Sequence, residues 1–362
     1  MKEMIGDLKM TREIKVRNLT IGGGASLTVQ SMTNTDTRDV AATVNQILEL
    51  ERAGCDIARF SVYDGECVAA VKKIRDKTHI PLVADVHFDY RLAIGAIENG
   101  IDKLRFNPGN IGSESNVEAL VSCAKAHKTP IRIGVNSGSL EKDILKELGA
   151  TSEAAVKSAM KHVRLLESFG FYDIVISIKM SSVTATVDAY KKISALVDYP
   201  LHIGVTESGT GDEGLIKSSI GIGSLLLSGI GDTLRVSLTG DPVNEVKAGL
   251  SILAALGLRS AVDIVSCPTC GRTTGDILGI VEKLKREYRG ARANVKIAVM
   301  GCVVNGPGEA READIGIAFA PGGAVVFKKG ERAYNGETDE TLFRFFKDVK
   351  EIIDERTSTG AG

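Results

Sequence analysis

Three cysteines near the end of the chain are spaced for metal or redox chemistry. Cys267 and Cys270 form a C-x-x-C pair in "SCPTCGRT", and Cys302 follows in "GCVVNGPGE". Such a set can bind zinc, form a redox dithiol with one thiol to spare, or hold an iron–sulfur cluster. The spacing favours the cluster, because no histidine lies near Cys302 to complete a zinc site and a thioredoxin-type dithiol would open a helix early in a small domain. Zinc and a redox dithiol remain open alternatives.

An iron–sulfur cluster would need a fourth ligand, and Glu309 is the candidate. It lies seven residues after Cys302, across "VVNGPG", whose turn-forming residues can fold a carboxylate back toward the thiols. An oxygen ligand is more labile than a thiolate, so an iron held in this way could exchange its ligand for a substrate oxygen. The alternative is an open iron that binds substrate directly.

Alternating polar residues mark the strands expected in the first two thirds of the chain. In "ARFSV", "VADVHF" and "LRFN", charged or polar residues alternate with apolar ones. Because side chains alternate faces along a strand, each of these strands has one polar face. The lumen of a barrel is usually packed with Val, Ile and Leu, so a polar lumen indicates a binding site. The residues that we expect in this site are Arg59, Asp85, His87, Arg105, Asn107, Arg132, Asn136, Lys179, His202, Arg235 and Ser237.

The cations of this set outnumber its acids. Asp85 and Glu207 can balance two of the arginine and lysine side chains, and a buried charge without a partner is costly. We therefore expect an anionic ligand at the C-terminal mouth of the barrel, and guanidinium groups suit the oxygens of a phosphate or diphosphate. Glu207 could carry a proton or only pair with a cation, and the sequence leaves both roles open.

Short apolar strands that alternate with amphipathic helices must position these residues. Eight such repeats predict an α/β fold, a TIM (β/α)8 barrel, with an open doubly wound sheet as the alternative. After residue 258 the pattern changes to a helix near 275–289, a strand at 295–301, a hairpin at 313–330 and a last helix, which predicts a smaller α+β domain. We therefore expect a substrate-binding barrel over 1–257 and a cluster domain over 258–362. The expected barrel strands are 27–32, 56–62, 80–88, 102–107, 130–136, 173–180, 200–207 and 232–239.

Composition excludes several other classes of protein. The chain has 362 residues, 43% of them hydrophobic, and a formal net charge of −1. Without a positive balance or a basic run, no nucleic-acid partner is expected. No apolar run approaches the roughly 18 residues of a membrane span, and the N-terminus lacks the apolar core of a signal peptide. Six cysteines are too few for a disulfide scaffold in a chain of this length, so we expect a cytoplasmic protein with reduced thiols.

Six motifs, taken together, resemble one known family. They are "VQSMTNTDT", "LRFNPGNIG", "PLHIGVTESG", "KSSIGIGSLLLSGIGDTLRVSLTGDP", "SCPTCGRT" and "GCVVNGPGEA". Their combination is similar to that of the bacterial 4-hydroxy-3-methylbut-2-enyl diphosphate synthases, oxidoreductases of the methylerythritol phosphate route to isoprenoids. The resemblance runs from about Ile14 to Lys350. Any single motif would be far less specific than the set.

The resemblance implies a TIM barrel followed by a reductase-like domain that holds a [4Fe–4S] cluster. The positions that match the family's cluster ligands are Cys267, Cys270, Cys302 and Glu309. The substrate implied is 2-C-methyl-D-erythritol 2,4-cyclodiphosphate, whose ring is opened by two electrons with loss of water. Flavodoxin or ferredoxin would supply the electrons, and the family's homodimer would share each active site between subunits.

The resemblance also assigns roles to single residues. The lumen residues named above match the family's substrate site, Glu207 becomes the candidate proton donor, and Asn305 is expected to face the substrate. One position departs from the family's pattern: Ser182 stands where the family carries an aspartate. That departure concerns one local contact.

Two rival functions follow from the same residues. A phosphate-binding lyase of the aldolase type would use Lys179 for a Schiff base and hold a structural zinc in its second domain. A non-enzymatic electron-transfer or cluster-sensing protein would use the barrel only as a scaffold. The bound metal and the fate of a cyclic diphosphate distinguish these functions.

Overall fold

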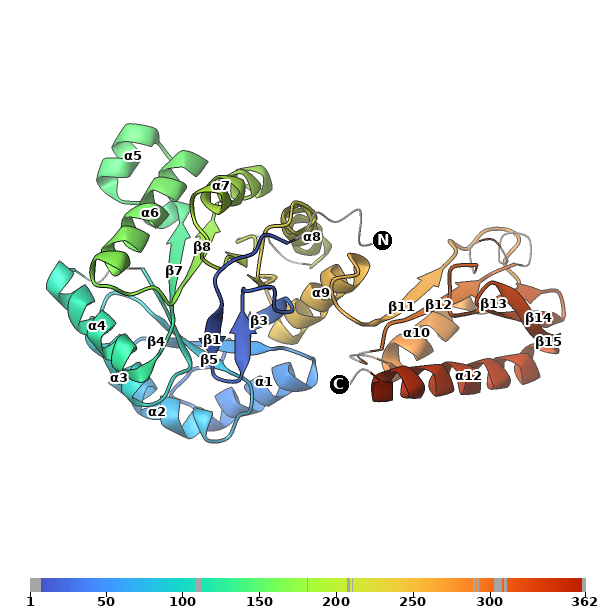
Figure 1. Ribbon diagram of the computed structural model, residues 1–362. Coiled ribbons are helices and arrows are strands. Elements are labelled where there is room, and N and C mark those ends of the chain that lie inside the picture. The colour runs from blue at the N-terminus through green and yellow to red at the C-terminus, as the bar shows by residue number, and fades with distance from the viewer. Residues whose placement is uncertain are drawn as a thin grey trace. The chain divides into compact units, whose positions relative to one another are not determined.

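The computed structural model of the protein describes residues 8–107, 112–180, 182–206, 209, 211–288, 291, 293–302, 308 and 311–359. The chain divides into two compact units, Met1–Leu256 and Gly257–Gly362. Figure 1 shows the elements of both.

The first unit is a closed parallel barrel of eight strands surrounded by helices (Figure 1). Neighbouring strands pair in the order β8-β7-β6-β5-β4-β3-β10-β9, and a bridge between Ile176 and Leu201 joins the two ends of this order. This closure confirms the predicted TIM barrel and excludes the open doubly wound sheet. The strands are β3 (Thr28–Met32), β4 (Ile57–Val62), β5 (Leu82–Val86), β6 (Lys103–Phe106), β7 (Ile131–Asn136), β8 (Ile174–Lys179), β9 (His202–Ile203) and β10 (Thr233–Leu234).

Local signals in the sequence set where the barrel helices begin and end. Asp39 and Asp64 each accept a hydrogen bond from a backbone N–H in the first turn of α1 and α2. Gly54 and Gly100 follow α1 and α3 with φ of 93° and 87°, a conformation that glycine adopts without strain. The helices are α1 (Val40–Arg52), α2 (Gly65–Arg75), α3 (Tyr90–Glu98), α4 (Glu114–His127), α5 (Lys142–Leu148), α6 (Ser152–Ser168), α7 (Val183–Leu196), α8 (Gly211–Leu227) and α9 (Pro242–Ala255).

A short hairpin, β1 (Ile14–Val16) and β2 (Leu19–Ile21), was not predicted from the sequence. It closes the N-terminal end of the barrel, because Ile14, Val16 and Ile21 pack against residues near the start of three barrel strands. Those residues are Ile57, Val83 and Val175. The bottom of the lumen is therefore apolar, and polar residues of the same strand parity lie above it.

The second unit is a five-stranded mixed sheet in the order β11-β12-β13-β14-β15. The first three strands are parallel and the last three antiparallel. Helices α10 (Ile277–Glu287) and α12 (Thr338–Thr359) bury their apolar faces against the sheet, with Leu284, Ile297 and Phe345 fully buried. The strands are β11 (Val262–Ser266), β12 (Val295–Met300), β13 (Ile315–Ala320), β14 (Gly323–Lys328) and β15 (Glu331–Gly336).

This unit confirms the expected α+β class and adds one strand. The predicted hairpin corresponds to β13 and β14, whereas β15 was missed because "ERAYNG" is an exposed edge strand without an apolar alternation. Across the described part of the chain, we find no helix with the length and apolar character that crossing a membrane requires.

Candidate functional site

The predicted polar residues lie on the inner face of the barrel. Val83 and Asp85 have the same parity on β5, and Val83 packs against the hairpin that closes the lumen. In the ladder, Asp85 pairs with Arg105 and Arg105 with Arg132, so the three side chains lie on the same face of adjacent strands. The alternation in the sequence therefore located the lumen correctly.

Asp85 is the acid at the centre of this cluster. Its Oδ1 accepts a hydrogen bond from Arg105 Nη1 at 2.9 Å, and its Oδ2 lies 3.7 Å from Arg59 Nε. Arg105 Nη1 also lies 2.9 Å from Nε2 of His87, whose side chain is 46% exposed. Burial opposes ionisation of Asp85, but Arg59, His87 and Arg105 together hold the pKa of this carboxyl well below its ordinary value.

A glycine makes room for one of these arginines. A Cβ on Gly134 of β7 would lie 2.6 Å from Nε and 2.9 Å from Nη2 of Arg105. No such contact can be tolerated without moving the guanidinium group. Gly134 thus allows Arg105 to lie flat across the neighbouring strand.

The ion pairs of Asp85 with Arg59 and Arg105 predict a specific pH dependence of the free energy of unfolding. Because the folded-state pKa is depressed, the stabilisation is complete above the unfolded pKa of about 3.9 and is lost as the pH falls below it. Asp85→Asn should lower the free energy of unfolding at pH 7 by about 3–5 kcal/mol, since it strands two buried cations. The deficit should narrow below about pH 4. Urea unfolding at pH 7 and at pH 3, followed by circular dichroism, measures the free energy of unfolding of the variant and of the unaltered protein.

A matched control is Asp143→Asn, because the Asp143 side chain is 73% exposed and pairs with Lys161 at 3.7 Å. This change should alter stability by less than about 1 kcal/mol at either pH. A constant Asp85→Asn deficit from pH 7 to pH 3 would show that charge at Asp85 does not stabilise the fold.

Arg235 has a partner that the sequence did not indicate. Its Nε and Nη2 donate to the two carboxylate oxygens of Glu245 at 3.1 and 3.0 Å, in the bidentate geometry that suits a guanidinium. Glu245 is 3% exposed and also accepts from Ser31 Oγ at 2.8 Å. The expectation that Asp85 and Glu207 were the acids available to the cluster is therefore wrong, because Glu245 on α9 already neutralises Arg235.

Three buried basic groups lack such compensation. Arg132, Lys103 and His202 are 1%, 0% and 0% exposed, and Arg132 Nε and Nη1, Lys103 Nζ and His202 Nε2 have no hydrogen-bond partner among the described residues. Burial, reinforced by neighbouring positive charges, lowers the pKa of each group well below its ordinary value. Burial also lowers the pKa of Arg59 to about 9, against the opposing charge of Asp85. Among the described residues, the barrel thus buries more basic groups than its acids can pair with.

Lys103 was missed in the sequence although a signal for it exists. It lies two residues before Arg105 on β6 and so has the same parity. Glu245 carried no such signal. It follows "DPVN" in the first turn of an expected helix, where a glutamate is ordinarily exposed to solvent and favoured by the helix dipole.

The remaining predicted lumen residues lie near the carboxyl ends of their strands. Lys179 is half-buried, and burial together with Arg235 and Arg59 lowers its pKa well below the ordinary value. Asn107 is buried, Asn136 is half-buried, and Ser237 Oγ is buried without a partner among the described residues. Glu207, the predicted proton donor, lies outside the described residues, as do residues 108–111 of the "NPGNIG" turn.

The cysteines of the second unit gather at one end of its sheet. Cys267 follows β11 directly, and Cys302 lies two residues after β12, the parallel neighbour of β11. Both therefore lie at the carboxyl ends of adjacent strands. The N–H of Gly301 donates to Cys267 Sγ at 3.0 Å, a hydrogen bond of the kind that stabilises a thiolate ligand.

Backbone contacts tie the third cysteine to the same place. Cys270 N–H donates to Thr273 Oγ1 at 3.1 Å, and Thr274 N–H donates to the carbonyl of Gly301 at 3.1 Å. The C-x-x-C loop is thus anchored beside Cys302. Cys270 is exposed, and hydrogen bonding from the backbone N–H of Arg272 lowers the pKa of its thiol, which favours the thiolate that binds metals.

Three thiols at one end of a sheet, with backbone donors aimed at sulfur, suit a soft metal centre. Within the described residues, no three His, Cys, Asp or Glu side chains are arranged closely enough to hold a metal ion. The predicted fourth ligand Glu309 and the predicted substrate contact Asn305 both lie outside the described residues.

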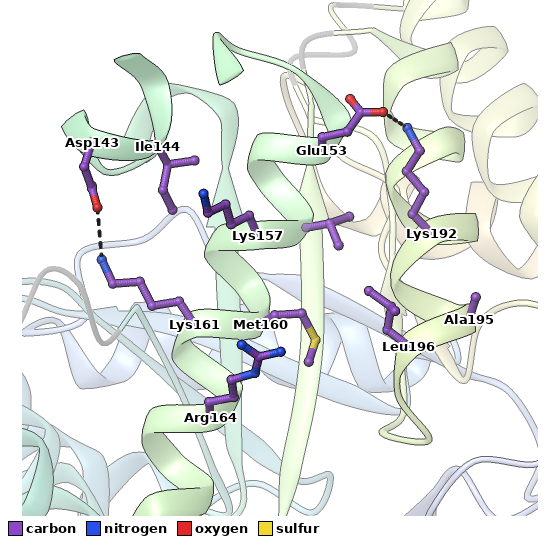
Figure 2. Close-up of a pocket in the computed structure, with 11 residues that line it drawn as sticks. Asp143, Ile144, Glu153, Lys157, Met160, Lys161, Arg164, Lys192, Ala195 and Leu196 are labelled. Atoms are coloured by element: carbon purple, nitrogen blue, oxygen red, sulfur yellow. Dashed lines mark hydrogen bonds and ion pairs between the residues drawn. The ribbon is translucent and has the colours of Figure 1, made fainter. Parts of the chain in front are cut away.

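A hollow on the outside of the barrel is separate from these residues (Figure 2). It is lined by α5, α6 and α7, with Ile144, Met160 and Leu196 among its apolar residues. Of its cations, Lys161 pairs with Asp143 at 3.7 Å and Lys192 with Glu153. None of the predicted site residues lines it.

The fold and its polar residues define a class: a TIM-barrel protein with a cationic lumen and a second domain that carries three cysteines at one end of its sheet. The family model described as the GcpE TIM-barrel domain matches residues 11–250, and the one described as the GcpE protein C-terminal domain matches residues 263–351. The chain therefore belongs to the GcpE family.

Curated relatives agree with this assignment. The chain is 56% identical over 354 residues to a protein of Caldanaerobacter subterraneus subsp. tengcongensis, covering 97% of this chain and 100% of the relative. It is 58% identical over 323 residues to one of Fusobacterium nucleatum subsp. nucleatum, covering 89% and 91%. Both are named 4-hydroxy-3-methylbut-2-en-1-yl diphosphate synthase (flavodoxin). Among solved structures, a Xanthomonas albilineans dihydropteroate synthase gives a TM-score of 0.49 at 14% identity, over 68% of this chain and 98% of that one.

Proposed function

We infer that the protein is an oxidoreductase that converts 2-C-methyl-D-erythritol 2,4-cyclodiphosphate to 4-hydroxy-3-methylbut-2-enyl diphosphate. Two curated relatives, which this chain matches over almost their whole length, are named as this synthase. The observation in the structure that supports it most is that Arg132 and Lys103 are buried inside the barrel with donor atoms that have no partner among the described residues, which an anionic ligand would satisfy. The reaction consumes two electrons and two protons, breaks the ring at a carbon–oxygen bond and releases one water.

The barrel residues bind and orient the diphosphate. Arg59 and Arg105 are each paired with Asp85, and guanidinium groups match phosphate oxygens in a bidentate geometry. Arg132 contributes donors that have no partner among the described residues, so the ligand can satisfy them. The other residues proposed for the substrate site are His87, Asn107, Asn136, Lys179, His202, Arg235, Ser237 and Asn305.

The thiols of Cys267, Cys270 and Cys302 would hold a [4Fe–4S] cluster, with Glu309 as the fourth ligand. The hydrogen bond from Gly301 to Cys267 Sγ and the anchored C-x-x-C loop fit a thiolate-bound centre. When bound, such a cluster supplies electrons at low potential to the substrate. A carboxylate at Glu309 is the most labile of these ligands, so this residue would leave room for a substrate oxygen.

A proton donor is needed where the hydroxyl leaves as water. We assign this role to Glu207, which comes four residues after the end of β9 in the sequence. His202 is an unsuitable donor, because burial and the charges of Arg132 and Lys103 lower its pKa and keep it neutral.

We also propose the partners and the location that the resemblance implies. The printed names of the relatives support flavodoxin as electron donor, and ferredoxin is the alternative. The chain would act as a homodimer with each active site shared between subunits. Reduced cysteines of this kind persist in the cytoplasm, which is the location that we propose.

Turnover of the cyclic diphosphate tests this function. Under anaerobic conditions, protein reconstituted with iron and sulfide should form the linear allylic diphosphate when reduced flavodoxin is present, and none when it is omitted. A covalent adduct on Lys179 after borohydride treatment, without reductant-dependent turnover, would instead identify the aldolase-type lyase.

A further inference from the structure

Met32 lies between two of the lumen arginines. It is the last residue of β3, and the sheet order places β3 between β4, which carries Arg59, and β10, which is followed directly by Arg235. Met32 pairs with Arg59 in the ladder, so the two side chains lie on the same face of adjacent parallel strands. A half-buried methionine therefore separates two cationic side chains that face the lumen.

The thioether of Met32 accepts hydrogen bonds from both guanidinium groups. Arg59 donates to Met32 Sδ through Nε at 3.0 Å and through Nη2 at 2.8 Å, so one whole edge of its guanidinium group is turned to the sulfur. Arg235 donates to the same sulfur through Nη1 at 3.8 Å. A thioether is a weak acceptor, but its sulfur is polarisable and so is attracted to a cation. The sulfur thus sets how the two guanidinium groups are turned relative to each other.

The two arginines need an acceptor at this point because their charges repel each other. Burial lowers the pKa of Arg59 to about 9, and the charge of Arg235 contributes to that shift. Each arginine also has an acid of its own: Glu245 accepts from Nε and Nη2 of Arg235, and Asp85 Oδ2 lies 3.7 Å from Arg59 Nε. Met32 supplies the contact that the two cations share.

The acceptor at position 32 must be weak if the two arginines are to bind an anion. A carboxylate there would neutralise both cations and compete with the anion for them. A hydrocarbon side chain would leave buried N–H groups without this acceptor before the ligand arrives. A thioether avoids both effects, because a charged phosphate oxygen binds a guanidinium group much more strongly than sulfur does and can replace it.

We propose that Met32 is a positioning residue for the diphosphate: its sulfur holds Arg59 and Arg235 in a fixed mutual orientation until a phosphate oxygen takes its place. Met32 acts through the two arginines and makes no bond to the reacting atoms. The inference deepens the proposed function and rests on it, because it concerns the same substrate site. The polar alternation of the strands did not reveal Met32, since methionine is neither charged nor strongly polar.

Two substitutions of Met32 separate the acceptor from the volume of the side chain. Met32→Leu keeps the apolar volume without an acceptor, whereas Met32→Gln places an amide oxygen at a similar reach. Isothermal titration of the full chain, reconstituted with iron and sulfide, should show the Kd of the cyclic diphosphate raised about 10-fold in Met32→Leu and less than about 3-fold in Met32→Gln. Met160→Leu is the matched control, because Met160 is half-buried on α6 in the outer hollow, and it should leave Kd unchanged.

A double-mutant cycle tests whether Met32 acts through an arginine. In the Arg59→Lys background, Met32→Leu should raise Kd by less than about 2-fold, because the guanidinium edge that the sulfur held is gone. A side chain that only filled volume would raise Kd by the same factor in both backgrounds. Equal factors would therefore overturn the proposal, and so would a smaller loss of binding in Met32→Leu than in Met32→Gln.

Titration of the same preparations with inorganic pyrophosphate separates this inference from the proposed function, because pyrophosphate binding needs no turnover. If Met32→Leu weakens pyrophosphate binding about 10-fold, the positioning role holds whether or not the cyclic diphosphate is reduced. If the unaltered protein turns over the cyclic diphosphate but Met32→Leu binds both anions with unchanged Kd, the positioning role is wrong and the proposed function stands. If the unaltered protein binds neither anion, both are wrong.

Discussion

Replacing Cys270 with serine should abolish the iron–sulfur centre and with it the reductase activity. Cys270 is exposed on a loop whose backbone is anchored by Thr273 and Gly301, so the substitution removes one sulfur without removing a packing contact. A serine hydroxyl is a harder and less acidic ligand than a thiol and does not replace it at iron. We expect iron and acid-labile sulfide to fall to a small fraction of the unaltered protein and turnover to fall by at least about 1,000-fold.

Cys123→Ser is the matched control. Cys123 is a half-buried thiol on α4 of the barrel, far along the chain from the other three. This variant should keep its iron, its visible absorbance and its turnover. Far-ultraviolet circular dichroism should be unchanged in both variants, which would place the loss in the metal centre and leave the barrel intact. Full iron content in Cys270→Ser would remove this cysteine from the ligand set.

Arg132→Met should weaken substrate binding without destabilising the ligand-free protein. Arg132 is 1% exposed, and Nε and Nη1 lack a partner among the described residues. Without substrate, replacing such a charge by an apolar side chain of similar length should leave the melting temperature unchanged or raise it. With substrate, the loss of the guanidinium should weaken binding by about 2–4 kcal/mol, which is roughly 30- to 1,000-fold in Kd.

Isothermal titration with the cyclic diphosphate and differential scanning calorimetry of the ligand-free protein measure the two effects. Arg164→Met is the control, because Arg164 is an exposed arginine on α6 at the outer hollow. It should alter neither Kd nor melting temperature appreciably. A large loss of stability in ligand-free Arg132→Met would mean that Arg132 supports the fold and not a ligand.

The barrel strands were predictable because each belongs to an apolar stretch of several residues that alternates with a helical pattern. Each of the eight expected barrel strands has a counterpart, although β9 and β10 are only two residues each. The hairpin β1–β2 was missed because three-residue strands show no period. The edge strand β15 was missed because none of its side chains is buried, so its sequence shows no alternation between buried and exposed positions.

The lumen was predictable because polar residues at every second position contradict the usual apolar packing of a barrel. The charge balance within it was not. Glu245 reaches Arg235 from α9, a contact that depends on how helix and barrel pack and leaves no trace in a strand period. Lys103 was within reach of the same alternation that revealed Arg105.

The arrangement of the cysteines could be anticipated only in part. The C-x-x-C spacing shows that Cys267 and Cys270 are near each other, but the approach of Cys302 follows from the parallel pairing of β11 with β12. Pairing between strands separated by a helix cannot be read from local spacing. The sheet brings the segments that carry Cys267 and Cys302 to the same end of the second unit.

The metal content of protein purified without oxygen is the most direct test of the central claim, a sulfur-bound iron centre in the second domain. The account predicts a brown protein with about four iron atoms and about four acid-labile sulfides per chain, and no stoichiometric zinc. A colourless protein with one zinc per chain and no labile sulfide would contradict it.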